Sequence, residues 1–106
     1  MNSPAQLDRS FSALSHPARR AIVARLALGS ATVAEATASV PLSKPAISKH
    51  VRVLENAGLL ERRIEGRTHR LTLDARAFDE AAGWLERHRR MWEAKLDAVE
   101  EWLSSS

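Results

Sequence analysis

The apolar positions of the chain follow a helical period, then a strand period, then a helical period again. Over residues 5–14 and 17–29 they recur every three or four residues, which predicts two amphipathic helices. Over 59–73 apolar and polar residues alternate on both sides of a Glu-Gly pair, which predicts a β-hairpin. From about 74 to 103 the helical period returns and continues almost to the end of the chain.

Two further helix signals lie between the second helix and the hairpin. Thr32 and Glu35 have capping-box spacing, and the helix that they begin must end before the next proline. Ser43 is typical of a helix N-cap and Gly58 of a C-terminal stop. Two helices joined by a short turn form a helix-turn-helix, which we predict over about 32–58.

The elements therefore follow the order helix, helix, helix, helix, hairpin, helix. This order predicts a mainly α fold with a small β-hairpin, namely a winged helix-turn-helix (ααααββα) in a single domain over 1–106. The hairpin at about 59–73 would be the wing. The helix at about 74–103 would serve for dimerisation, because its large apolar residues recur at intervals of seven with others between them. They are Phe78, Leu85, Trp92, Leu96, Val99 and Leu103.

Charge is distributed unevenly along the chain. Residues 1–74 contain eleven Lys or Arg against six Asp or Glu, whereas 75–106 contain five against seven. The front is thus +5 and the back −2, which adds up to the net +3. A basic front half favours a polyanionic partner, although solvated surface charge alone would also explain it.

The helix that begins at Ser43 has one apolar and one basic side. At 100° per residue, Ile47, Val51 and Leu54 share an arc that faces the core. The residues outside this arc, together with those at the N-terminal end, are candidates to enter the major groove of double-stranded DNA. The candidates are Ser43, Lys44, Pro45, Ala46, Ser48, Lys49, His50 and Arg52. His50 lies at the edge of the arc, so a half-buried histidine bonded to a neighbour is an equally good interpretation.

The hairpin is rich in arginine and has few acidic residues. Basic side chains on a projecting ribbon are placed for phosphates or for the minor groove, although a solvated hairpin is the structural alternative. The candidate contacts on the hairpin are Arg62, Arg63, Arg67, Thr68 and Arg70.

Other classes of protein find little support in the sequence. There is no cysteine, and the four histidines are scattered one per element, so we expect no metal and no cofactor. No apolar run is long enough for a membrane span and no secretory signal opens the chain, so we expect a cytoplasmic protein. No phosphate loop or nucleophile–base arrangement predicts an enzyme. A winged helix used for protein–protein contact is the alternative function, but it would call for an apolar outer face.

Three ordered stretches resemble the ArsR family of bacterial winged-helix repressors. They are FSALSHPARRAIVARL (11–26), TVAEA (32–36) and LSKPAISKHVRVLENAGLLERRIEGRTHRLTL (42–73). The resemblance implies a homodimer that binds a pseudo-palindromic operator and represses transcription, with the segment 43–52 in the major groove. It also implies a dimer interface made by the first and last helices, which adds Leu7, Phe11 and Leu14 to the apolar residues of the last helix.

The metal motifs of that family are missing from this chain. The helix over 32–39 has no cysteine, and the last helix reads Asp79-Glu80-Ala81 and His88 followed three positions later by Met91. The sequence instead resembles a metal-independent branch with aromatic-rich last helices. Trp84, Trp92 and Trp102 are interpreted as core packing or, alternatively, as an aromatic pocket for an apolar small-molecule effector. The releasing signal, whether a small molecule, a protein or the amount of regulator, stays open.

Overall fold

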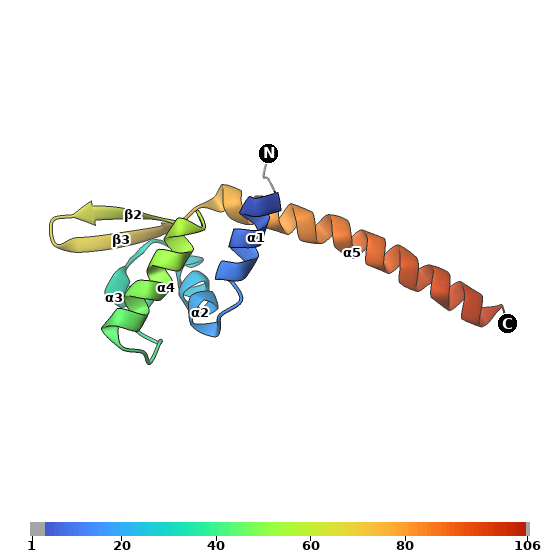
Figure 1. Cartoon of the computed structure of the whole chain (residues 1–106), viewed down its shortest axis with the longest axis horizontal. Coiled ribbons are helices and arrows are strands. Elements are labelled where there is room, and N and C mark those ends of the chain that lie inside the picture. The colour runs from blue at the N-terminus through green and yellow to red at the C-terminus, as the bar shows by residue number, and fades with distance from the viewer. Residues whose placement is uncertain (1–3, 106) are drawn as a thin grey trace.

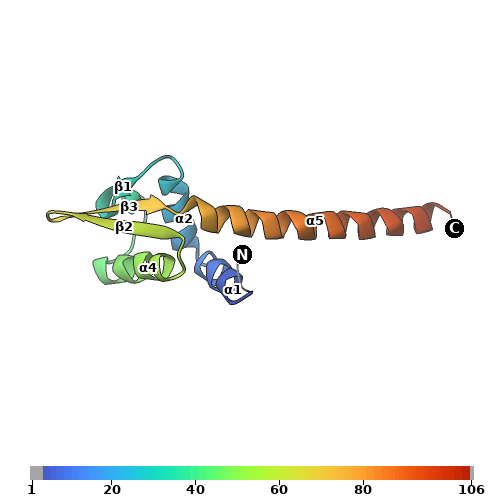
Figure 2. The same cartoon turned by 90° about the horizontal axis from the view of Figure 1, so that it is seen from above.

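The computed structural model describes residues 4–105, without the side chains of Pro4 and Trp92. Its elements follow the predicted order (Figure 1), with one addition, a short strand before the third helix that is labelled β1 in Figure 2. They are α1 (Pro4–Ala13), α2 (Pro17–Leu26), β1 (Ala31–Thr32), α3 (Val33–Ala36), α4 (Lys44–Asn56), β2 (Leu60–Glu65), β3 (Thr68–Leu73) and α5 (Ala75–Ser104).

The start of α3 and the end of α4 lie where the capping residues predict them. Thr32 Oγ1 accepts the N–H of Glu35 at 3.1 Å, and Glu35 Oε1 accepts the N–H of Thr32 at 3.0 Å, which completes the capping box. At the end of α4 the N–H of Gly58 donates to Glu55 O at 3.0 Å and that of Leu59 donates to Leu54 O at 3.1 Å. This Schellman arrangement needs the left-handed backbone of Gly58, whose φ is +75°. It turns the chain from α4 directly into the wing.

The sheet has three strands rather than two, so the prediction of an isolated hairpin was incomplete. Its order is β1-β3-β2, with both pairs antiparallel. Ala31 pairs with Leu71, and both are fully buried. The extra strand thus ties the root of the wing to the segment that leads into α3.

The core lies beneath the root of the wing. Its largest fully buried side chains come from α2, α4, the α4–β2 turn and β3, and are Ile22, Val51, Leu54, Leu59 and Leu71. Leu54 and Val51 lie on the arc of α4 predicted to face inward. Burial of this arc fixes the rotation of α4 about its axis and therefore decides which of its residues face solvent.

Helix α5 extends far beyond the rest of the chain (Figures 1 and 2). The radius of gyration is 18.1 Å, whereas a compact domain of this length has about 13 Å. Its N-terminal half contacts α1, where the rings of Phe11 and Trp84 meet edge-on with centroids 5.4 Å apart. From Arg89 to Ser105 every described side chain is exposed. In the part of the chain that the structure describes, no helix is both long and apolar enough to cross a membrane.

Candidate nucleic-acid interface

The outer face of α4 is polar and basic, as its periodicity predicts. Lys44, Ser48, Lys49 and Arg52 are exposed, as is Pro45 in the first turn, while Ala46 is half-buried. Ser43 Oγ accepts the N–H of Ala46 at 3.4 Å, so this hydroxyl caps the helix. The exposed basic residues Lys44, Lys49 and Arg52 lie in the N-terminal two-thirds of the helix.

The wing carries its charge towards its tip. The two strands meet at Gly66, whose φ of +62° allows the tight turn. Arg63, Arg67 and Thr68 are exposed. Arg70 is partly exposed, and its Nε lies 3.7 Å from a carboxylate oxygen of Glu65.

The tip of the wing and the N-terminal end of α4 lie at the same end of the molecule, opposite the free end of α5 (Figures 1 and 2). Five cations on these two elements have no ion pair to any described carboxylate. They are Lys44, Lys49, Arg52, Arg63 and Arg67. We call them the five-cation cluster. A group of unneutralised side chains on two projecting elements is a binding surface for a polyanion.

His50 lies inside the domain, so we remove it from the predicted DNA contacts. Only 8% of the residue is exposed. Its ring lies tilted against that of His16, with centroids 4.4 Å apart, and the Arg19 guanidinium donates to its Nδ1 at 3.2 Å. Because a guanidinium can only donate, Nδ1 must be the unprotonated ring nitrogen. His50 therefore fastens α4 to α2, which is the half-buried alternative that the sequence left open.

Burial lowers the pKa of His50 below its ordinary value of about 6.5, and the neighbouring His16, Arg19 and Lys49 lower it further. Its contribution to stability is thus present in full above that ordinary value and is lost as the pH falls through it towards the pKa in the folded chain. Protonation would replace the Arg19 hydrogen bond by the contact of two cations.

We expect the free energy of unfolding of the wild type to fall more between about pH 7.5 and pH 5 than that of a His50→Gln variant. Glutamine can accept the Arg19 N–H at either pH and does not titrate. Denaturant titrations at the two pH values measure the difference. His88→Gln is the control, because His88 lies in α5 and does not contact His50, and its unfolding free energy should keep the wild-type dependence on pH. An unchanged pH dependence in His50→Gln would contradict this role.

Arg62 also departs from its predicted role as a phosphate contact. Its guanidinium binds both carboxylate oxygens of Glu55, at 3.3 and 3.2 Å, and lies 3.0 Å from Nδ1 of His69. Only 24% of its side chain is exposed. The sequence shows the charge of Arg62 but not this pairing, because Glu55 lies on a different element. We therefore omit Arg62 from the contact surface.

Comparison with known proteins places the chain in a family. A helix-turn-helix domain family matches residues 14–63. The crystal structure of an ArsR family transcriptional regulator, RHA00566, shares 33% identity and superposes with a TM-score of 0.79. The match covers 87% of this chain and 95% of that one. The chain belongs to the ArsR family.

Two further relatives are also transcriptional regulators. An ArsR-like transcriptional regulator from Rhodococcus sp. RHA1 is 30% identical, with a TM-score of 0.73 and 92% of each chain covered. The transcriptional regulator Rv2034 of Mycobacterium tuberculosis is 47% identical over 53 residues. That match spans 50% of this chain and about half the length of the relative. Among the described residues of this ArsR member, no group of three or more His, Cys, Asp or Glu could hold a metal ion.

The residues predicted for the dimer interface of this ArsR member fall into two groups. Leu14 and Phe78 are half-buried against the core of their own chain, and Phe11 contacts Trp84. Leu7 is half-buried in α1. The others on α5 are more than half exposed, and are Leu85 (53%), Leu96 (59%), Val99 (52%) and Leu103 (58%). Trp92 belongs to the same stripe by sequence, but its side chain lies outside the described residues.

The structure places Trp84 in a packing contact, whereas Trp102 is exposed. Trp84 packs on Phe11 and stacks on the ring of His88, with centroids 3.8 Å apart. His88 Nδ1 lies 2.8 Å from the carbonyl oxygen of Trp84. Trp84 therefore serves packing between α1 and α5. Trp102 is 68% exposed at the far end of α5.

Proposed function

We propose that the protein binds double-stranded DNA with sequence specificity and represses transcription as a homodimer. The observation that carries this proposal is the five-cation cluster on α4 and the wing. These side chains have no described carboxylate partner, so they are free to replace the counterions of a DNA backbone.

In this proposal α4 enters the major groove, which is wide enough for one helix. Its first two turns would face the bases, because the small residues Ala46 and Ser48 let the backbone come close. Lys49 is exposed next to them in the second turn, and it can reach a guanine acceptor. Arg63 and Arg67 on the wing would bind phosphates or the adjacent minor groove.

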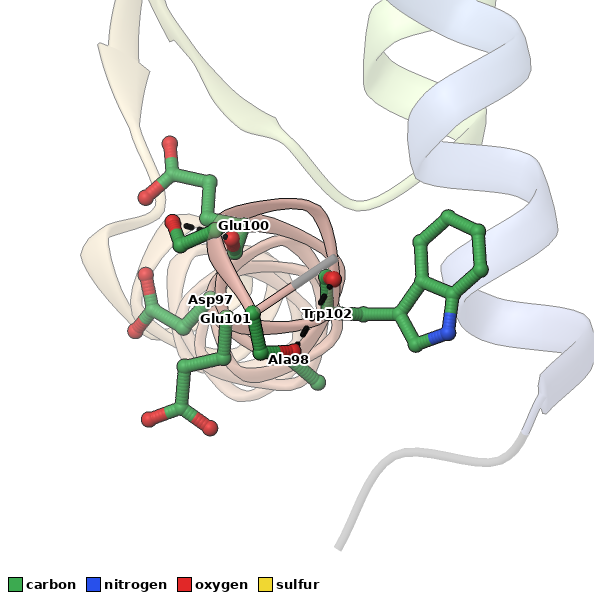
Figure 3. A pocket seen from close by; sticks show the side chains of 7 residues that line it. Asp97, Ala98, Glu100, Glu101 and Trp102 are labelled. Carbon is green, nitrogen blue, oxygen red and sulfur yellow. Dashed lines mark hydrogen bonds between the residues drawn. The ribbon is translucent and has the colours of Figure 1, made fainter.

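Helix α5 supplies the second part of the proposal, the dimer. Leu85, Leu96, Val99 and Leu103 fall within an arc of about 60° at 100° per residue, and all are exposed in the single chain. An apolar stripe of this kind on a projecting helix is suited to pack against a second copy. At the free end of α5 the carboxylates of Asp97, Glu100 and Glu101 project to one side and Trp102 to the other (Figure 3). The helix thus remains amphipathic to its last turn.

A two-fold dimer would require a pseudo-palindromic operator with half-site centres about 34 Å apart. Selection of bound duplexes from a random DNA pool tests the function directly. We expect enrichment of an inverted repeat, which should also be found upstream of genes that the protein regulates. If no sequence is enriched and binding is equal on all duplexes, specific DNA recognition is wrong, and a module for protein–protein contact would replace it.

Metal ions should not release the DNA. The chain has no cysteine, and its described residues form no cluster of ligands. We therefore expect stoichiometric zinc, cadmium or arsenite to leave the affinity for the enriched duplex unchanged. Fluorescence anisotropy with and without each metal measures this, with a chelator as the control. A tight zinc complex that dissociates from the duplex would contradict the prediction.

A further inference from the structure

A cluster of three polar side chains joins the recognition helix to both strands of the wing. Glu55 lies in the last turn of α4, Arg62 in β2 and His69 in β3. The Arg62 guanidinium donates through Nε and Nη2 to the two oxygens of Glu55, at 3.3 and 3.2 Å. Its Nη1 donates to Nδ1 of His69 at 3.0 Å. One planar group on β2 therefore contacts both α4 and β3, and it binds the carboxylate in the two-pronged geometry that Arg forms best.

This cluster lies where the wing leaves the body of the domain. Leu60 is buried and Arg62 is partly buried, whereas Arg63, Ile64 and Glu65 are all exposed. The Glu55–Arg62 pair is itself shielded, with 34% and 24% of the two side chains exposed. Beyond it, Arg63, Ile64 and Glu65 pair with β3. The pair is thus placed to set the angle between wing and α4.

A small change of that angle would be felt at the tip. From Arg62 to Gly66 the strand extends over roughly 13 Å at about 3.3 Å per residue. A rotation of about 10° at the root would then move the tip by roughly 2 Å, which is enough to separate a guanidinium from a phosphate oxygen. We infer that Glu55 and Arg62 are positioning residues that hold the wing against α4, so that Arg63 and Arg67 meet the DNA backbone while α4 reads the bases.

This inference rests on the proposed DNA binding, and its test uses the sign of an electrostatic effect. Glu55→Gln removes a negative charge from the surface that would face a polyanion. Long-range electrostatics alone would then strengthen DNA binding. Loss of wing positioning would weaken it, because neutral Gln cannot form the charge-assisted fork with Arg62. The two effects have opposite signs.

We expect Glu55→Gln to bind the duplex enriched in the selection experiment about five- to tenfold more weakly than the wild type. The slope of log affinity against log salt should also become shallower, by about one unit for each phosphate that the wing no longer reaches, although no cation has been removed. Glu61→Gln is the matched control, since Glu61 is exposed, adjoins Arg62 and has no ion pair among the described residues. It should bind as the wild type or more tightly, with the slope unchanged.

Two further measurements separate positioning from simple loss of stability. Arg62→Lys keeps the charge but loses the fork, so it should weaken binding like Glu55→Gln, and the double variant should be no worse than either single one. Denaturant unfolding should show that the three variants are folded under the binding conditions. Tight binding by Glu55→Gln, or simple additivity of the two changes, would overturn the inference. Absence of binding by the wild type would instead overturn the proposed function, and this inference with it.

Discussion

Replacement of Leu96 by Glu is expected to leave the chain folded but monomeric, and to weaken operator binding by at least about 100-fold, which corresponds to about 2.7 kcal/mol. Leu96 is 59% exposed in the single chain, so the change removes nothing from its core. In a two-fold dimer the substitution occurs twice, and each copy would place an uncompensated carboxylate in an apolar seam, at about 3–5 kcal/mol each. The monomer would bind the operator with only one α4 and one wing.

Sedimentation velocity at micromolar concentration measures the assembly state, and anisotropy on the enriched duplex measures the affinity. Ala94→Glu is the control. It adds the same charge to the same exposed helix, but two residues away, on the side opposite the stripe. This variant should remain dimeric. A wild-type protein that sediments as a monomer, or a Leu96→Glu variant that remains dimeric, would contradict the proposed seam.

The second prediction with a large effect distinguishes a residue that recognises bases from one that binds the phosphate backbone. Lys49→Ala should weaken binding to the operator far more than binding to a scrambled duplex. A good interaction with a base edge is worth about 1–3 kcal/mol of discrimination, or roughly 5- to 150-fold. Arg67→Ala should weaken binding to both duplexes together. It should also lower the salt dependence by about one unit for each phosphate that the variant no longer neutralises in each protomer.

Titrations at several salt concentrations on both duplexes measure these effects together. Arg90→Ala provides the control, because Arg90 is 73% exposed on α5, away from the end that carries α4 and the wing. It removes the same charge and should change neither specificity nor slope. Equal weakening on both duplexes for Lys49→Ala would show that another residue reads the bases.

Local signals in the sequence predict the elements and the outward face of α4. The Thr32–Glu35 capping box and the Gly58 stop depend on residues within a few positions of each other, so the sequence states them directly. The exposure of Lys44, Lys49 and Arg52 follows from the helical period and the apolar arc opposite. The structural relatives confirm the winged helix-turn-helix that this order of elements predicts.

What the sequence does not show depends on contacts between distant segments. Strand β1 has only two residues and exists because it pairs with β3, some forty positions later, so no periodicity announces it. His50 faces inward because its ring contacts Arg19 of α2 and His16 at the start of α2. In the sequence Arg62 resembles the other arginines of the wing, and only the fold brings it next to Glu55. In each case the local sequence pattern is ordinary. The contact that decides the role of the residue is with a segment far away in the sequence, and only the tertiary fold brings the two together.

The extension of α5 has a consequence for the amount of protein in the cell. From Arg89 onwards the described side chains of this helix are all exposed in the single chain, and most of the stability of a helix in a protein comes from packing of its amphipathic face. Ion pairs of Arg89 with Glu86 and Glu93 help within the helix, but exposed pairs contribute little. We therefore expect ordering of this segment and pairing with a second copy to be one event. At low concentration most copies would be monomers, in which the end of α5 would be frayed and open to proteases. The rate of degradation would therefore rise as the concentration of the protein falls.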